Sequence, residues 1–238
     1  MKRILGKRTL MRAIRWWLPL LSFINAPQVF ASMPQDPIPF GRNSTVLSPT
    51  LSLSDITYDP EQGNEFDIER KILGLGLSFP LGSNASGDFA LGVITETEVE
   101  NINEDGSGYQ ILFGGKGMIH RSGSMAINVH GSFSLLSETI KDGSFKVELE
   151  TTELRLGSTI SAILSSKIVP YAGLELNLLS DGKQKRKTSF GTSDFDYERD
   201  DMLGLRLGTK ILVGQAGFKA EALLMGERTI TLGVDIAL

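Results

Sequence analysis

Seven charged residues recur at alternate positions within apolar and glycine-rich segments in the second half of the chain. Glu153 and Arg155 lie two positions apart, and this spacing places both side chains on one face of a β-strand. Charged groups in an interior must pair, so these residues either close that interior or line a narrow polar path through it. The predicted interior set is Glu153, Arg155, Glu175, Arg206, Lys210, Lys219 and Glu221.

Two specific pairs follow from counting residues across the expected turns. We expect Arg155 to lie opposite Glu175, and Lys210 to lie opposite Glu221. We favour a structural plug over a conducting path, because a barrel of about ten strands is far narrower than an open porin.

His130 and Ser132, with Glu138 nearby, are the residues that come nearest to a catalytic set. A serine nucleophile needs a base within hydrogen-bond reach and an acid to orient that base. In residue type the three resemble the set of outer-membrane lipid A deacylases, but the surrounding residues of that family are missing. Alternation also turns His130 and Ser132 inward, away from lipid. We therefore expect no catalysis, and lipid A modification is the least favoured alternative; an omptin-type protease pattern is not found either.

Metal and cofactor sites are not expected. Asn101, Asn103 and Asp105, followed by Gly106, match the first half of a calcium loop. The position that should supply a bidentate glutamate is Leu112, so an exposed acidic loop is the better interpretation. The chain has no Cys, which excludes disulfides and thiolate ligands.

A second charged region divides by sign. The basic half comprises Lys183, Lys185, Arg186 and Lys187, and the acidic half comprises Asp194, Asp196, Glu198, Asp200 and Asp201. Such a run is usually a solvated, self-neutralised loop. The functional hypothesis is that the basic half binds lipopolysaccharide phosphates or another surface ligand, since loops carry specificity in barrel proteins.

The elements that position these residues are β-strands, because apolar and small or polar residues alternate along most of the chain. The segment from Leu73 to Phe79 is the clearest example, with Leu73, Leu75 and Leu77 on one face. We predict about ten strands (eight is the alternative), at 50–58, 66–79, 87–99, 108–119, 125–136, 146–164, 168–178, 202–213, 216–225 and 228–238. Connections after even-numbered strands are mostly tight, whereas those after odd-numbered strands, above all 179–201, are mostly longer and charged. This pattern is typical of a transmembrane barrel.

The first 49 residues belong to no predicted strand. Basic residues precede the apolar stretch Trp16–Ile24, and Val29-Phe30-Ala31 offers a cleavage site, so residues 1–31 are predicted to be a cleaved signal peptide. That stretch is shorter than the about 20 residues of a membrane-spanning helix. Residues 32–49 contain four prolines and are predicted to be an extended periplasmic lead-in, which leaves 50–238 for the barrel.

The apolar face of the predicted barrel should contact lipid rather than fill a soluble core. Glycine and serine on the polar face suit a crowded lumen, and aromatic residues gather near the predicted strand ends. The segment Val169-Pro170-Tyr171-Ala172-Gly173-Leu174-Glu175 and the alternating C-terminal strand resemble small outer-membrane barrels of the OmpA and opacity-protein type. The resemblance implies a closed antiparallel up-and-down barrel in a Gram-negative outer membrane, inserted by the barrel-assembly machinery. One departure is the last residue, Leu238, where that family usually has an aromatic residue.

The leading hypothesis is a non-catalytic barrel that contributes to envelope integrity or surface interaction through its loops. The alternative is a narrow channel for small solutes. We expect contacts with outer-membrane lipid or lipopolysaccharide and a monomer, and the net charge of −4 argues against nucleic acid as a partner.

Overall fold

The computed structural model describes residues 44–60, 65–82, 84–100, 102, 106–142, 145–165, 167–189, 191–199, 202–225 and 227–238. The predicted signal peptide (1–31) and the lead-in as far as residue 43 lie outside these ranges. Within them, no helix is long and apolar enough to cross a membrane. The strands are β1 (Val46–Pro60), β2 (Phe66–Pro80), β3 (Ala85–Val99), β4 (Gly106–Ser122), β5 (Met125–Asp142), β6 (Phe145–Ala162), β7 (Ile168–Thr188), β8 (Gly191–Arg199), β9 (Leu203–Val213), β10 (Ala216–Leu224) and β11 (Glu227–Ala237).

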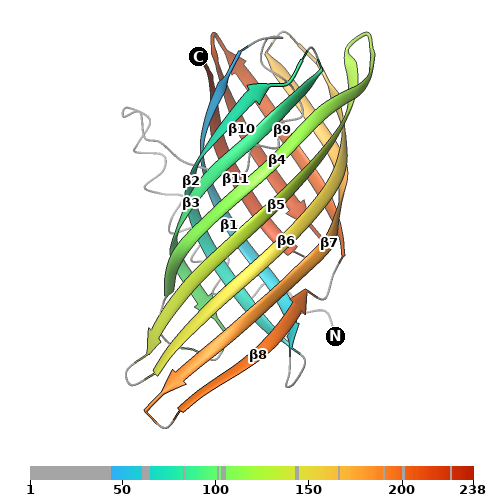
Figure 1. The fold of residues 1–238 in the computed structure, drawn as a ribbon. Coiled ribbons are helices and arrows are strands. Elements are labelled where there is room, and N and C mark those ends of the chain that lie inside the picture. Colours follow the sequence, from blue (N-terminus) through green and yellow to red (C-terminus); the bar gives the residue numbers. More distant parts are fainter. Residues whose placement is uncertain are drawn as a thin grey trace, which may run out of the picture.

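Ten of these strands close an antiparallel barrel, as predicted (Figure 1). Neighbours in sequence pair from β1 to β7, then β7 pairs with β9, and β11 returns to β1 from Val46↔Ala237 to Ile56↔Glu227. Tight connections such as Gly123–Ser124 and Gly214–Gln215 gather at one end, which we call the turn end. The opposite end, where β1 joins β2 and β7 joins β8, is the loop end.

The eleventh strand, β8, changes the barrel at the loop end. It pairs with β7 from Asp181↔Glu198 to Thr188↔Gly191, and with β1 from Tyr58↔Arg199 to Pro60↔Tyr197. At this level β8 therefore replaces β9, β10 and β11, and the ring consists of the eight strands β1 to β8. The β6–β7 register shifts between Leu154 and Arg155, close to where β7 changes partner from β9 to β8. A bulge at this position bends the strand and redirects its pairing.

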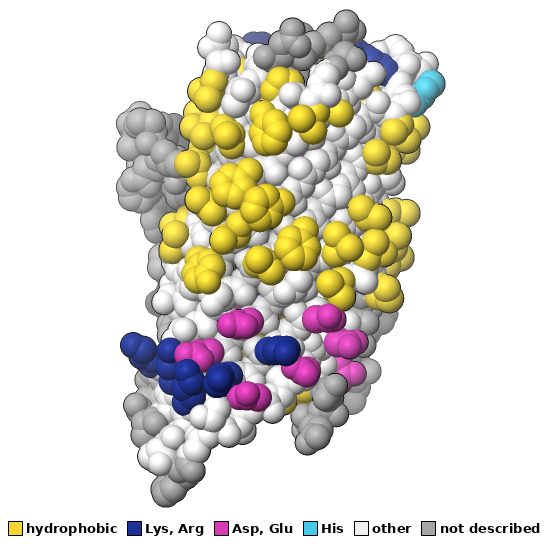
Figure 2. Space-filling view, viewed as in Figure 1, with side chains coloured by type: hydrophobic (Ala, Val, Ile, Leu, Met, Phe, Trp, Pro, Cys, Tyr) yellow, Lys and Arg dark blue, Asp and Glu magenta, His cyan; other side chains and the backbone are white. Residues whose placement is uncertain are grey.

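The side chains of the ten-stranded part are arranged inside out. Outward residues are apolar and exposed, including Leu91 (50%), Leu174 (53%) and Phe218 (50%), whereas the inward charges Glu175 and Lys210 are fully buried (0%). On the face that Figure 2 shows, the apolar side chains form a broad belt, with a band of charged residues on its loop-end side. A soluble barrel has the reverse arrangement, so the predicted transmembrane barrel is confirmed.

The eight-stranded ring is filled by apolar residues and is called the neck below. Its buried cluster consists of Ile56, Tyr58, Ile68, Val99, Ile140, Val147, Leu149 and Tyr197. The Tyr197 ring meets the Tyr58 ring edge-on, with centroids 5.0 Å apart. Tyr197 also lies over its cross-strand partner Gly182, where any Cβ would collide with the ring. Among the described residues, packed apolar side chains therefore fill the neck at the loop end.

The largest differences from the predicted boundaries, of four residues or more, concern β1, β5 and β7. β1 begins at Val46, inside the predicted lead-in, and its β11 register has no partner for Ser48 or Pro49, so the missing proline N–H falls on an unpaired stretch. β5 continues to Asp142, through a segment predicted to be a loop. Residues 179–201 were likewise predicted to be a loop, but most of them form the end of β7 and β8. Alternation continues beyond the membrane in these segments, where the outward residues are charged because they face water.

Candidate functional site

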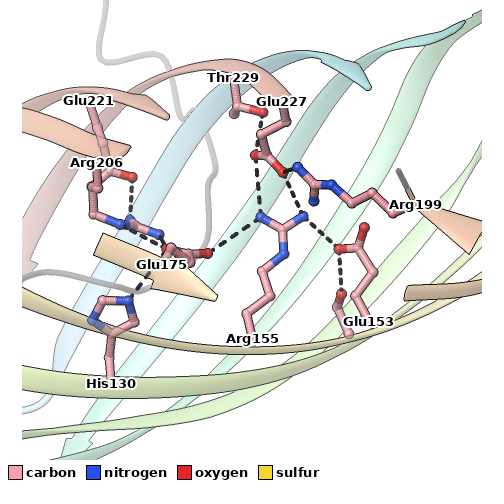
Figure 3. A network of polar contacts seen from close by, with 10 residues as sticks. His130, Glu153, Arg155, Glu175, Arg199, Arg206, Glu221, Glu227 and Thr229 are labelled. Carbon is pink, nitrogen blue, oxygen red and sulfur yellow. Dashed lines mark hydrogen bonds and ion pairs between the residues drawn. The ribbon is translucent and has the colours of Figure 1, made fainter. Parts of the chain in front are cut away.

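A buried set of charged side chains, shown from close by in Figure 3, crosses the ten-stranded lumen on the turn-end side of the neck. We call it the central network; it comprises His130, Glu153, Arg155, Glu175, Arg199, Arg206, Glu221 and Glu227. These residues come from β5 to β11, so the network connects strands that are far apart in sequence. Alternate positions of each strand point inward, which is why parity in the sequence identified most of its members.

Arg155 is the hub of the central network. Its Nη2 lies 2.7 Å from Glu153 Oε2 and 3.1 Å from Glu227 Oε2, and its Nη1 lies 3.5 Å from Glu175 Oε1. The predicted Arg155–Glu175 contact is therefore made, but diagonally, because the strand partner of Arg155 is Asn177. One guanidinium thus neutralises carboxylates from three strands.

Arg206 holds the β7, β9 and β10 side of the network. It contacts Glu175, and its Nη1 lies 2.6 Å from Glu221 Oε1. Tyr171 donates a hydrogen bond to Glu221 at 2.8 Å. Glu221 therefore pairs with Arg206, and the predicted position of Lys210 directly opposite Glu221 is wrong. The β9–β10 turn has two residues, so Lys210 lies opposite Lys219.

The turn end of the lumen holds Lys210 and Lys219 beside acidic partners. Lys210 Nζ lies 2.8 Å from Asp235 Oδ2, and Ser48 donates a hydrogen bond to Asp235 at 2.7 Å. Lys116 Nζ lies 3.8 Å from Asp88 Oδ1. Asp235 and Asp88 are not in the predicted interior set, which covers strands six to nine only, although alternation along β11 and β3 places both side chains inward.

Two further ion pairs join the lumen to the neck. Arg199 of β8 lies 2.6 Å from Glu227 of β11, so it ties the neck to the ten-stranded wall. Arg70 donates hydrogen bonds to both carboxylate oxygens of Glu138 at 2.9 Å and to the Tyr58 hydroxyl at 3.0 Å, at the border between the neck and the lumen. The sequence does not predict an inward position for Arg199, because Arg199 falls within the predicted loop 179–201.

The inward charges of the described strands balance. Seven cationic side chains face seven carboxylates, so the lumen needs no counter-ion. The cations are Arg70, Lys116, Arg155, Arg199, Arg206, Lys210 and Lys219, and the carboxylates are Asp88, Glu138, Glu153, Glu175, Glu221, Glu227 and Asp235. A cavity of about 60 Å³ lies beside Arg155 and Arg206. The described lumen is therefore packed rather than open.

His130 and Ser132 are both buried in this lumen and cannot meet a lipid. His130 Nε2 lies 3.5 Å from Glu175 Oε2. Glu138, the predicted orienting acid, is bound to Arg70 and lies eight residues from His130 along β5, about 26 Å away in a strand. The three residues therefore do not assemble as a nucleophilic triad.

The four cations of the predicted basic loop lie on the end of β7, outside the belt. Lys187 Nζ lies 2.8 Å from Glu148 Oε2, and Arg186 stacks on the Phe145 ring at 4.6 Å from its centroid. Lys183 and Lys185 point outward between acidic residues of β6 and β8. Lys187 and Arg186 are thus held by neighbouring side chains, whereas Lys183 and Lys185 face outward.

Metal ligands do not converge in the part of the chain that the structure describes: no group of three His, Asp or Glu side chains there is arranged to hold a metal ion. Asn101, Asn103 and Asp105 of the calcium-like segment, and Asp200 and Asp201 of the acidic half, lie outside the described residues.

Solved structures resemble the chain in fold only. The outer-membrane protease OmpT from Escherichia coli matches with a TM-score of 0.55 and 10% sequence identity, over 87% of this chain and 99% of that one. The translocator domain of the autotransporter NalP from Neisseria meningitidis matches with a TM-score of 0.50 and 11% identity, over 97% and 96%. No family model and no curated protein sequence matches. The chain thus has the fold of Gram-negative outer-membrane β-barrels.

Proposed function

We propose that this chain is a closed, non-catalytic outer-membrane barrel that acts in envelope structure or surface interaction. The observation that carries the proposal is the filling of the described interior: balanced ion pairs occupy the lumen, and an apolar cluster occupies the neck. The charged ends of β6, β7 and β8 project beyond the belt, where they can meet other molecules.

Planar bilayer conductance tests the closed lumen. The purified chain, inserted at neutral pH beside a porin as positive control, should give no stable unitary conductance. Reproducible channels would overturn the proposal in favour of the narrow solute channel.

A cellular assay tests the surface role. Replacing Lys183, Lys185, Arg186 and Lys187 together by glutamine should increase the sensitivity of the envelope to a bulky hydrophobic antibiotic, while outer-membrane amounts of the protein stay unchanged. Unaltered sensitivity at equal amounts would contradict a surface role for this segment. Lipid A mass spectrometry of cells with and without the chain should show no difference.

A further inference from the structure

An outward hollow lies on the ends of β6, β7 and β8, beyond the apolar belt. It has a volume of about 490 Å³, within the range of small-molecule sites. Its charged walls form two cross-strand rows. The rows are Glu148, Lys185 and Asp194, and Glu150, Lys183 and Asp196. Each row thus places a lysine between two carboxylates.

The charges that line the hollow do not neutralise one another directly. Glu148 is bound by lysines outside the rows, Lys146 at 2.6 Å and Lys187 at 2.8 Å. Among the residues that the structure describes, no ion pair within 4.0 Å joins Lys183 or Lys185 to a carboxylate. Two ammonium groups and three carboxylates, those of Glu150 and the two β8 aspartates, therefore remain available at its walls.

This pattern selects a ligand that carries both signs of charge. A simple anion at the lysines would also face three carboxylates, and a simple cation at the carboxylates would face two lysines; both are disfavoured by like-charge repulsion. A phosphate group between Lys183 and Lys185 makes charge-assisted hydrogen bonds, and an ammonium a few ångströms away reaches Asp194 and Asp196. We propose that the hollow binds a zwitterionic phosphate ester of the phosphoethanolamine type.

Two sources can supply this chemistry. The residues that line the hollow lie on the strand ends next to the belt, where a lipid headgroup at the membrane surface can reach them. A soluble phosphate ester can reach it from outside. The inference rests on the proposed outer-membrane surface role, but it does not depend on whether the lumen conducts.

The first test uses soluble probes on the full chain refolded in detergent. O-phosphoethanolamine should bind at least about tenfold more tightly than inorganic phosphate or ethanolamine, measured by isothermal titration or NMR shifts, since one tenfold step corresponds to one good charged contact. Lys183→Ala with Lys185→Ala should abolish this binding, whereas the exposed control Lys141→Ala with Lys167→Ala should not change it. Equal binding of phosphate alone, or unchanged binding by the lysine variant, would overturn the proposal.

A selectivity switch provides the second test. Asp194→Asn with Asp196→Asn removes the repulsion of anions and leaves the lysines, so inorganic phosphate should bind more tightly and the preference for the zwitterion should be lost. A retained preference for the zwitterion over inorganic phosphate would show that these carboxylates do not bind the ammonium group, and it would overturn the proposal.

Native mass spectrometry distinguishes the two sources. From mixed nanodiscs, preferential retention of phosphatidylethanolamine over phosphatidylglycerol that is lost in the lysine variant identifies a lipid headgroup as the ligand. Lysine-dependent binding of the soluble ester without lipid preference identifies a soluble ligand, and absence of both contradicts the site. Bilayer conductance is read separately, so failure of the site and failure of the closed barrel are distinguishable.

Discussion

The ten-stranded lumen and the eight-stranded neck solve the same packing problem with opposite chemistry. Along β6, the neck residues Val147 and Leu149 point inward, and the lumen residues Glu153 and Arg155 lie on the same face nearer the turn end. The outward face changes from charged to apolar at the same level, with Leu156 exposed on the belt. Beyond the membrane, β6 therefore has apolar residues inward and charged residues outward, as in a soluble protein. Within the membrane, the same strand has charged residues inward and apolar residues outward.

The strand count explains why each interior suits its contents. A ring of eight strands is narrow enough to be filled by branched aliphatic side chains and two tyrosines. A ring of ten is wider, so long arginine, lysine and glutamate side chains meet across it and satisfy one another. β8 therefore determines the width of the neck, because its insertion between β7 and β1 produces the narrower ring.

Removing the hub of the central network should have the largest effect. Arg155→Met leaves the buried carboxylates of Glu153 and Glu227 without their shared cation, so we expect a loss of about 3–5 kcal/mol in the free energy of unfolding. Urea unfolding in lipid vesicles measures it. The exposed control Lys141→Met should change stability by less than about 0.5 kcal/mol. A loss below about 1 kcal/mol for Arg155→Met would mean that water replaces the pair.

A double-mutant cycle at the junction tests whether the lumen chemistry is required below the neck. Arg70→Met alone and Glu138→Leu alone should each cost about 3 kcal/mol, because each leaves a buried unpaired charge. The double variant should recover to within about 1 kcal/mol of the parent, because two apolar side chains that replace both buried charges can pack against the adjacent apolar neck. A double variant as unstable as each single one would show that the ion pair itself supports the junction, and fully additive losses would show that Arg70 and Glu138 are not coupled.

Alternation in the sequence predicted the ten barrel strands well, because side-chain direction in a strand depends on a local backbone rule. Alternation did not predict the strand ends beyond the membrane. The charged outward residues Lys183 and Lys185 suggested a loop there, although β7 continues to Thr188. The partner change of β7 depends on a bulge near Leu178 that has no strong sequence signal. The predicted cross-strand neighbours of Arg155 and Lys210 were wrong, because an error in turn length moves every pair across that turn.

A glycine in the neck should show how tightly the narrow ring is packed. Gly182→Ala places a Cβ against the Tyr197 ring, so we expect a loss of about 1–3 kcal/mol. The matched control is Gly117→Ala in β4, where the nearest atom to an added Cβ is 3.7 Å away, an ordinary contact. If the two variants unfold at the same urea concentration, Tyr197 moves freely and the neck is looser than the lumen.

The smallest effect belongs to Glu148, on the charged outward face above the belt. Hydrogen bonds from Lys146 and then Lys187 lower the pKa of its carboxyl from 4.5 to about 2. Because the folded pKa lies below the unfolded one, the stabilising contribution is present above about pH 4.5 and is lost as the pH falls through about 2. Carboxyl carbon NMR should show this low midpoint, and Lys146→Ala with Lys187→Ala should return it towards 4.5. A midpoint near 4.5 in the parent chain would mean that the two lysines do not hold Glu148 in solution, and the walls of the outward hollow would then be less ordered than those of the lumen.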